Sequence, residues 1–453
     1  MSKLDPNWVW ASGGLAAGCI LTVCVSKITG LFSQKAVMDD KDEMDAISNF
    51  NNQVTTFSDI TMLVGTPFTS AHTMTTSEYL IYPAEKGYPK LEGNRTIMAR
   101  YLTQQVYEDL FNLRTSSGCD FDTCIQTGID CSEKVSCGLV AGDEECYDLF
   151  SVVFDPVISD RHRGFGRGNE IIGQEMNISD LKANVFDRRY VKSIHFLVGR
   201  CIKGFRFPPT CRRAERRHTE KLLKDVLLSL EDNFEGSYHH LVDLSPEERY
   251  QLPDILQSVT DAPISRTLIS SGSTRDWPCG RGVFYSQSCD LFAWTNREDH
   301  LRIMYRDRDM DIVAAFKSFT RALEEIKSKL GDAGLEYSIH KDYGHLLTCP
   351  SGIGTALRAG VHLKLPNLIC DPRFRTIIKN LRLHMGAEDQ DMLKKGYVDV
   401  YNMDRLGYSE VYLVQRVADA VDLLIKMEQR LEHKQAISQL ITKSENFNDD
   451  LDY

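Results

Sequence analysis

The sequence predicts an α+β protein: a small all-helical domain, then a larger domain with an antiparallel sheet flanked by helices. Apolar residues recur at helical spacing over residues 88–155, and beyond residue 186 strand-like runs alternate with long amphipathic stretches. The length of 453 residues allows two or three domains with a sizeable core. With 42% hydrophobic and 26% charged residues, the chain is neither wholly disordered nor a polytopic membrane protein.

The first element is an uncharged segment of 21 residues, 6–26. This length just reaches the minimum for spanning a bilayer, so residues 1–35 are predicted to form a single-pass transmembrane anchor. Gly14 and Gly18 have the spacing that lets membrane helices approach closely. A cleaved targeting peptide is the alternative. A mitochondrial presequence is rich in arginine, whereas the first arginine here is Arg95, and a secretory signal remains open.

A polar and acidic arm over residues 36–87 follows the anchor. Of the formal net charge of −11, residues 39–45 carry −4. Residues 443–453, at the end of an acidic tail over 436–453, carry −3. The acidic balance excludes a general nucleic-acid binder, which needs a basic face, and no nucleic-acid partner is expected. The rest of the chain is nearly neutral, so an anionic substrate remains allowed.

The small helical domain is predicted over residues 88–165. Ile97, Tyr101, Leu102 and Val106 recur at helical spacing, and a second apolar run lies between residues 144 and 154. Glycines cluster between residues 164 and 168, which suits a flexible connection to the next domain.

The larger domain is predicted over residues 186–435. Strand-like apolar runs and helical apolar stripes are both present, which favours a largely antiparallel sheet with helices packed on it. The strands are expected at 190–197, 283–294, 301–305, 346–348, 359–365 and 397–401, and the long helices at 213–230, 309–330 and 409–431.

The chain has thirteen cysteines, an odd number. None of them form a Cys-x-x-Cys pair, and the five between Cys119 and Cys146 are irregularly spaced. Zinc sites usually show paired ligands at short, repeated spacing, so reduced structural thiols and no metal site are predicted.

Two stretches carry chemistry-bearing side chains. Residues 295–302 pack a carboxylate, an imidazole and a guanidinium between two apolar strands. Residues 348–362 run from Cys349 through a small-residue loop to Arg358 and His362. Each stretch also fits a plain polar turn, and the second a turn with a buried cysteine. The chain has no P-loop, no HExxH motif and no nucleophile elbow.

Several longer strings decide between these interpretations. Cys-Ile-Gln-Thr-Gly stands at 124–128, Val-Ala-Gly-Asp-Glu-Glu at 140–145 and Phe-Asp-Pro-Val at 154–157. Ala-Glu-Arg-Arg at 214–217, Asp-Trp-Pro at 276–278 and Asp-Arg-Leu-Gly at 404–407 follow in order. With these strings the chain resembles the phosphagen kinases, and most closely their mitochondrial creatine kinase branch. That family transfers a phosphoryl group between Mg-ATP and a guanidino compound, and its two-domain fold agrees with the one predicted above.

The resemblance implies roles for six residues. Glu298 matches the carboxylate that aligns the guanidino group, and Cys349 matches the reactive cysteine. The nucleotide-binding positions are matched by Arg302, Arg358, His362 and Asp399, the first two as phosphate-clamp arginines. If the protein is active, its nucleotide is therefore Mg-ATP or Mg-ADP and its second substrate a guanidino compound.

The chain departs from the family pattern in its phosphate clamp. His195 and Leu197 stand where the family has two phosphate-binding arginines. A third arginine is missing from the segment after residue 383, where Glu388 and Asp389 add negative charge. Because one transition-state arginine can be worth about 10³–10⁵ in rate, the loss of three predicts a nearly inactive protein.

Two functions therefore remain. The first is a membrane-anchored, catalytically impaired pseudoenzyme that serves as a structural or assembly subunit. The second is an active guanidino kinase in which Arg188, Arg200 or Arg297 replaces the missing charges. The resemblance further implies a homodimer or a larger membrane assembly, placed at the mitochondrial inner membrane or intermembrane space.

Overall fold

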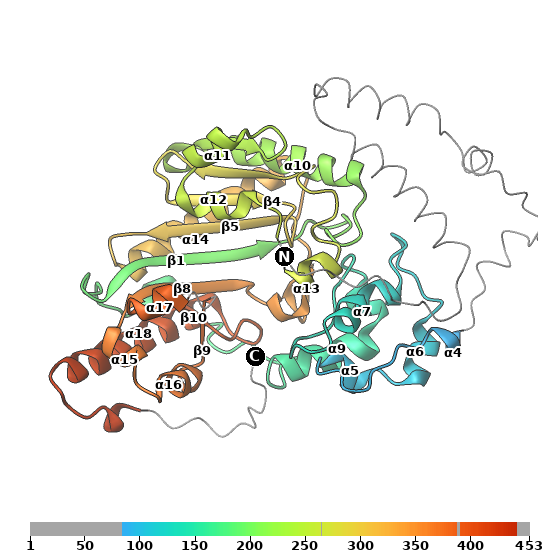
Figure 1. Cartoon of the computed structure of the whole chain (residues 1–453). Helices are drawn as coiled ribbons and strands as arrows, with labels where there is room; N and C mark the ends of the chain where they lie inside the picture. The colour runs from blue at the N-terminus through green and yellow to red at the C-terminus, as the bar shows by residue number, and fades with distance from the viewer. Residues whose placement is uncertain (1–83, 264, 387–389, 442–453) are drawn as a thin grey trace, which may run out of the picture. The chain divides into compact units, whose positions relative to one another are not determined.

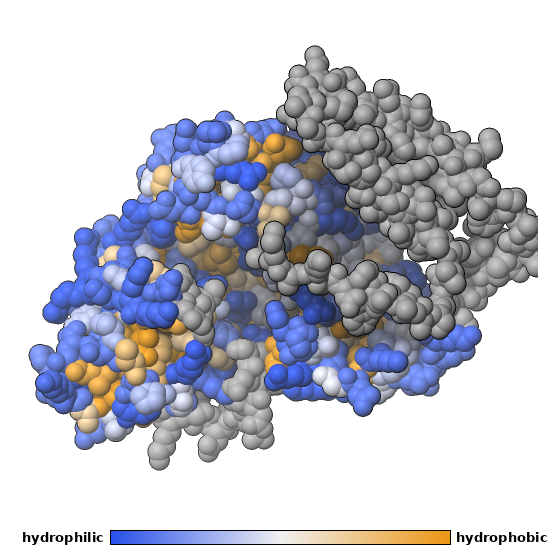
Figure 2. Space-filling model, viewed as in Figure 1, coloured by the Kyte–Doolittle hydropathy of each residue, from blue (hydrophilic) through white to orange (hydrophobic). Residues whose placement is uncertain are grey.

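The computed structural model describes residues 84–441, except 264 and 387–389. A helical domain is followed by a sheet domain (Figure 1). The predicted anchor, nearly all of the predicted arm and the predicted tail beyond residue 441 lie outside the described residues. Among the helices that are described, none is long and apolar enough to cross a membrane, and that search does not reach residues 6–26. In the view of Figure 2 the described surface is mainly hydrophilic, with apolar residues in small groups.

The helical domain confirms the first part of the predicted fold. Its helices are α4 (Ala84–Gly87), α5 (Met98–Tyr101), α6 (Gln104–Leu110), α7 (Phe121–Asp130), α8 (Cys146–Leu149) and α9 (Ser151–Arg161). The Asp120 side chain caps α7 by accepting from the Thr123 backbone N–H at 2.8 Å. Gly128 lets α7 approach another segment closely, since a Cβ there would lie 2.4 Å from the carbonyl oxygen of Gly138.

The large sheet has eight strands in the order β2-β3-β4-β5-β1-β8-β10-β9, and every neighbouring pair is antiparallel, as predicted. The strands are β1 (Val191–Arg200), β2 (Gly236–His240), β3 (Gly282–Ser286), β4 (Leu291–Thr295), β5 (Leu301–Asp307), β8 (Leu357–Lys364), β9 (Leu383–Met385) and β10 (Tyr397–Asn402). A separate two-stranded ribbon joins β6 (Ile339–His340) to β7 (Gly344–His345).

Three long helices cover one face of this sheet: α10 (Arg213–Leu228), α14 (Ile312–Asp332) and α18 (Glu410–Glu432). Their apolar stripes share one core with the strands; for example, Phe196 of β1 stacks on Phe319 of α14 with ring centroids 5.4 Å apart. The shorter helices are α11 (Pro246–Gln251), α12 (Asp254–Thr260), α13 (Arg266–Ser270), α15 (Pro366–Ile369), α16 (Phe374–Asn380) and α17 (Gln390–Lys394).

Two predicted strands were wrong. The run at 283–294 is a hairpin of β3 and β4, because the backbone turns at Cys289 with a positive φ of 56°. The run at 346–348 belongs to no strand. Its backbone instead contacts the helical domain: the Leu347 carbonyl accepts from the Tyr147 hydroxyl at 2.6 Å, and the Thr348 carbonyl accepts from the Ala141 N–H at 2.7 Å.

The glycine-rich connection after α9 is held by an arginine rather than left loose. Arg167 pairs with Asp155 at 2.7 Å, Asp148 at 2.9 Å and Asp342 at 3.8 Å. Its guanidinium also lies 5.2 Å from the ring centre of Tyr343. These contacts join the connection to both domains, which the glycine content alone did not indicate.

Candidate active site

Six predicted site residues share the sheet face opposite the main core: His195, Leu197, Arg302, Arg358, His362 and Asp399. Residues paired directly across antiparallel strands point to the same face. The register pairs Leu197 with Arg358, and His362 with Asp399. His195 lies two residues from Leu197 in β1 and is therefore on the same side. The sheet thus brings together residues that are about 200 positions apart in the sequence.

Glu298 and Arg302 lie at the hairpin between β4 and β5. Arg302 Nη2 donates to Glu298 Oε2 and lies 3.5 Å from Asp299 Oδ2. Burial works against the charge of Arg302, but the two carboxylates outweigh it and raise the pKa of its guanidinium. The Thr348 hydroxyl donates to the Glu298 carbonyl at 2.7 Å. That bond places the predicted carboxylate next to the loop that carries the predicted cysteine.

Cys349 is exposed at the start of this loop. Its sulfur lies 3.1 Å from the Ser351 hydroxyl. Hydrogen bonding with Cys137 and then with Ser351 lowers the pKa of the Cys349 thiol to about 6. A lowered pKa favours the thiolate form, which is the reactive form of a cysteine.

The two positions at which the sequence predicts a loss of clamp arginines, 195 and 197, carry no positive charge. His195 is buried, its Nε2 lies 3.5 Å from Asp399 Oδ1, and burial lowers the pKa of its imidazole. The ring lies over Gly360, where an added Cβ would come within 2.1 Å of Nε2. Leu197 is half-buried and packs with the apolar cluster that includes Met304 and Trp277. A neutral imidazole and an isobutyl group thus occupy this part of the face.

Arg358 already has an internal counter-charge. Its Nη2 pairs with Asp399 Oδ2 at 3.1 Å, and its guanidinium lies 3.5 Å from the ring centre of Tyr401. His362 is stacked on Tyr397, with ring centroids 5.6 Å apart and planes within 4°. Both side chains are therefore held in place by neighbours from β10.

Two family models match this chain. A family model described as the N-terminal domain of ATP:guanido phosphotransferase matches residues 92–159, and one described as its C-terminal catalytic domain matches residues 218–431. The chain belongs to the ATP:guanido phosphotransferase family. The predicted family is confirmed, whereas the nearer likeness to the mitochondrial branch stays a prediction.

Individual relatives agree with this assignment. Creatine kinase M-type of Gallus gallus is 39% identical over 381 residues, covering 83% of this chain and 99% of the relative. The crystal structure of lombricine kinase superposes with a TM-score of 0.75 at 34% identity, covering 80% of this chain and 100% of that one. The substrate-free duplicated taurocyamine kinase of Schistosoma mansoni gives a TM-score of 0.67 at 26% identity, covering 76% and 48%.

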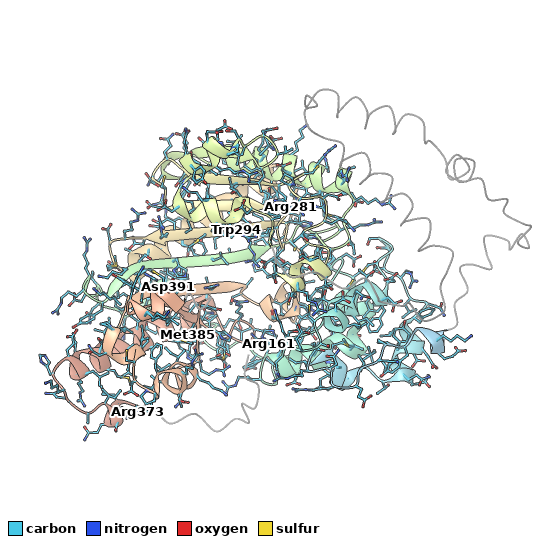
Figure 3. The ribbon with its side chains drawn as sticks, in the orientation of Figure 1. Arg161, Arg281, Trp294, Arg373, Met385 and Asp391 are labelled. Carbon is cyan, nitrogen blue, oxygen red and sulfur yellow. The ribbon has the colours of Figure 1, made fainter. Side chains whose placement is uncertain are left out.

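Two further arginines, Arg161 and Arg405, lie near the candidate site of this ATP:guanido phosphotransferase family member. Burial, and then the charges of Arg161, Arg302 and Arg358, lower the pKa of Arg405 to about 10. Arg161 ends α9 on the side of the helical domain nearest to β9 and β10 (Figure 3). In the sequence, Arg405 stands in the Asp-Arg-Leu-Gly string, which supported the family resemblance. The string did not indicate that Arg405 lies near the site.

The three arginines suggested as substitutes lie in different places. Arg188 pairs with Asp309 at 3.2 Å, and its side chain is 70% exposed. Arg200 lies on the core face of β1, where it donates to the carbonyl of Gly199 at 2.7 Å. Only Arg297 is near the site, within electrostatic range of Glu298 and Arg302.

Four guanidinium groups around this face retain an unused donor. Within the described residues, the buried Nε atoms of Arg297, Arg302, Arg358 and Arg405 have no hydrogen-bond partner. Buried donors are normally satisfied, and an anionic ligand supplies acceptors for such groups. The arrangement therefore has the capacity to hold an anion.

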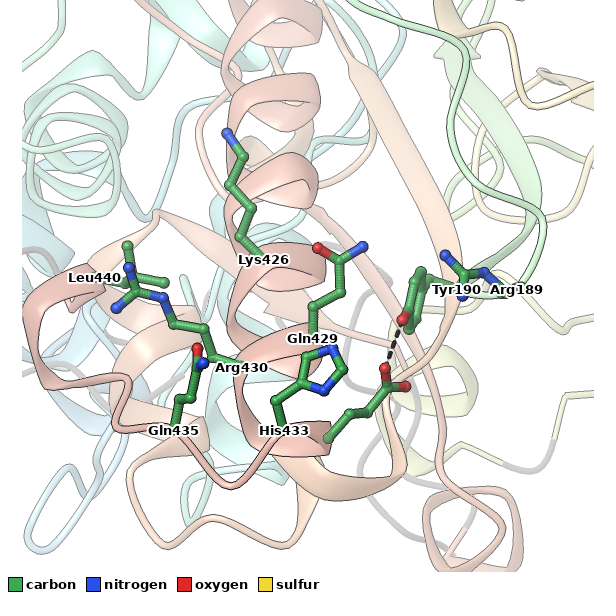
Figure 4. A pocket seen from close by; sticks show the side chains of 9 residues that line it. Arg189, Tyr190, Lys426, Gln429, Arg430, His433, Gln435 and Leu440 are labelled. Atoms are coloured by element: carbon green, nitrogen blue, oxygen red, sulfur yellow. Dashed lines mark hydrogen bonds between the residues drawn. The ribbon is translucent and has the colours of Figure 1, made fainter.

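The predicted acidic residues Glu388 and Asp389 lie outside the described residues. The flanking residue Gly386 donates its N–H to the Asp399 carbonyl at 2.7 Å, which ties the start of that segment to β10. A separate pocket of about 460 Å³ lies at the end of α18 (Figure 4). It is lined by none of the predicted site residues, and the Tyr190 hydroxyl donates to Glu432 at 2.7 Å across it.

Proposed function

We propose that this chain is a creatine-kinase-like member of its family with little or no phosphoryl-transfer activity, acting as a structural or assembly subunit. The observation that supports the proposal is that His195 and Leu197, at the positions predicted to have lost two clamp arginines, place neutral side chains on the sheet face beside Arg358. Phosphoryl transfer depends on positioning and charge neutralisation, so neutral side chains at these positions remove what the reaction needs most.

The electrostatics of the face support this proposal. Arg358 is neutralised by Asp399, and Arg302 by Glu298 and Asp299. A triphosphate would have to compete with these carboxylates for both arginines. Because each charge-assisted contact is worth roughly 1.5–3 kcal/mol, two missing arginines remove about 3–6 kcal/mol of phosphate binding.

A coupled assay with Mg-ADP and phosphocreatine, repeated with phosphoarginine, tests the proposal. We expect turnover far below the ordinary kinase range of about 1–100 per second. Turnover of about one per second or faster with either phosphagen would refute it. Calorimetric titration with Mg-ADP on the same preparation separates the loss of transfer from the loss of nucleotide binding.

An active guanidino kinase is the second candidate, and the position of Arg405 favours it. Its guanidinium lies within electrostatic range of Arg161, Arg302 and Arg358. Among the described residues, four site arginines also have a buried Nε donor without a hydrogen-bond partner. In this alternative Arg405 replaces part of the clamp. Arg405→Lys would then lower kcat/KM at least tenfold, whereas in an impaired protein it would leave a basal rate unchanged.

Membrane tethering through residues 6–26 forms part of the proposal. The support is the length of the uncharged segment, which suits a single span. We expect the full chain to stay in the membrane pellet after carbonate extraction. Recovery of a soluble species beginning near residues 27–40 would refute tethering. By likeness to the mitochondrial branch, we further propose a homodimer or larger assembly at the inner membrane, with a guanidino substrate and Mg-ATP only if active.

A further inference from the structure

Three cysteine thiols meet inside the helical domain. Cys119 precedes α7, Cys124 lies within it, and Cys146 begins α8. The Cys119 and Cys124 sulfurs are 3.9 Å apart, and those of Cys124 and Cys146 are 3.8 Å apart. All three sulfurs lie within 4.8 Å of one another, and all three residues are buried. The domain thus contains a compact triangle of thiols that the candidate active site does not use.

The spacing of this triangle fits a tetrahedral metal ion. Zinc binds thiolate sulfur at about 2.3 Å, and two such ligands at the tetrahedral angle are separated by about 3.8 Å. The two measured separations, 3.8 and 3.9 Å, match that value. A disulfide would require two sulfurs to approach to about 2.05 Å and would leave the third thiol unpaired.

A carboxylate lies beside the triangle and is itself oriented. Asp143 Oδ1 is 3.4 Å from the Cys146 sulfur and accepts from the Cys146 N–H at 3.1 Å. Asp143 Oδ2 accepts from the hydroxyls of Thr115 at 2.6 Å and Ser117 at 2.5 Å. These hydrogen bonds hold the carboxylate beside the Cys146 sulfur, as the outer hydrogen-bond partners of metal ligands are held in many metal sites.

A surface pocket lies beside this carboxylate. Asp143 and Ser117 line the pocket, of about 420 Å³, together with residues of the Lys203–Arg206 turn. Asp143 therefore borders the pocket and also contacts the Cys146 sulfur.

We propose that the helical domain binds one zinc ion through Cys119, Cys124 and Cys146, with Asp143 as a hydrogen-bonding neighbour of Cys146. Three soft thiolates form a ligand set that suits Zn²⁺ rather than a hard cation such as Mg²⁺. The bound ion links the start of α7 to α8, because its three buried ligands lie on these segments. No metal site was predicted from the sequence, since the spacing Cys-x₄-Cys followed 22 residues later by a third cysteine has no paired repeat.

The test uses the full chain, purified under reducing conditions, loaded with Zn²⁺ and desalted before elemental analysis by mass spectrometry. We expect about one zinc per chain, since structural sites of this kind bind with high affinity. Cys124→Ser should reduce the zinc content at least tenfold. Cys131→Ser is the matched control, because Cys131 is a buried cysteine at the end of α7 outside the triangle.

Two further measurements remain informative if Cys124→Ser fails to fold. Co²⁺ added to the unmodified chain should give thiolate-to-cobalt charge-transfer absorption and the visible bands of a tetrahedral ion. Asp143→Asn, which removes the carboxylate that contacts the Cys146 sulfur, should weaken zinc binding about 10–100-fold in competition with a chromophoric chelator. The proposal is overturned if the unmodified chain retains no zinc, if Cys124→Ser retains as much, or if the cobalt spectrum lacks thiolate absorption. None of these readouts depends on kinase activity.

Discussion

Adding positive charge at the two predicted clamp positions is the most direct test of the proposal that transfer fails. The double variant His195→Arg, Leu197→Arg places two guanidinium groups on the sheet face beside Arg358. Each charge-assisted contact to phosphate is worth roughly 1.5–3 kcal/mol, so two contacts add at most about 3–6 kcal/mol to nucleotide binding.

The surroundings of residues 195 and 197 determine how much stability the two substitutions lose. Leu197 is only half-buried beside Trp277, and an arginine stem can cover part of the same apolar surface, so the loss of packing is about 1 kcal/mol. A guanidinium at position 195 finds Asp399 as a counter-charge within 3.5 Å of the present ring, but it also meets the charge of Arg358. After these costs, we expect Mg-ADP affinity to rise by at least about tenfold, equivalent to 1.4 kcal/mol.

The assay measures Mg-ADP affinity by calorimetry and transfer by the coupled reaction. If the missing arginines limit the reaction, the rate should rise by about 10³ or more. Ser237→Arg is the matched control, because it adds a charge at an exposed position near the far edge of the same sheet. If the folded double variant binds Mg-ADP no more tightly than the unmodified chain, the reasoning about the clamp is refuted.

Two other predictions concern stability and thiol reactivity. Asp276→Asn should lower the free energy of unfolding by about 3 kcal/mol in urea titrations at pH 7, because fully buried Arg216 loses its counter-charge, 2.9 Å away. Hydrogen bonds from Arg213 and then Arg216 lower the pKa of Asp276, so this contribution is complete above about pH 4 and is lost below it. An unchanged difference at pH 3 would contradict that. Cys349, with a pKa of about 6, should react with iodoacetamide at a rate that rises between pH 5 and 7 and then levels off. Exposed Cys370 serves as the comparison within the chain, and equal rates for both at pH 7 would contradict the prediction.

The strong periodic patterns predicted most of the fold. The three long helices begin and end within three residues of their expected limits, as α14 at Ile312–Asp332 illustrates. The short strands β2 and β9 were missed, because five and three residues carry too little alternation to distinguish them from loops. The extended segment at residues 346–348 was mistaken for a strand, since its partners belong to the helical domain and no local pattern reveals them.

The site could be predicted only in part. The motif strings identified which residues to examine, but not that Arg358 is paired with Asp399 or that Arg405 approaches from the loop after β10. These relations arise from strand register and from contacts between segments that are distant in the sequence. The thiol triangle was missed for a related reason. The three cysteines are irregularly spaced in the sequence, and their sulfur atoms come together only in the folded domain.

Alternate side chains of β1 face the core and the candidate site, which explains how a member of this family could keep its fold and lose its activity. Ile194, Phe196 and Val198 enter the core, and their burial is what the sheet needs. His195 and Leu197, between them, face the site and contribute little to that core. A change of side chain at these two positions would therefore leave the strand, its register and the helices behind it intact. A close match in fold to known kinases thus gives no information on whether transfer survives, and only the side chains on the site face decide it.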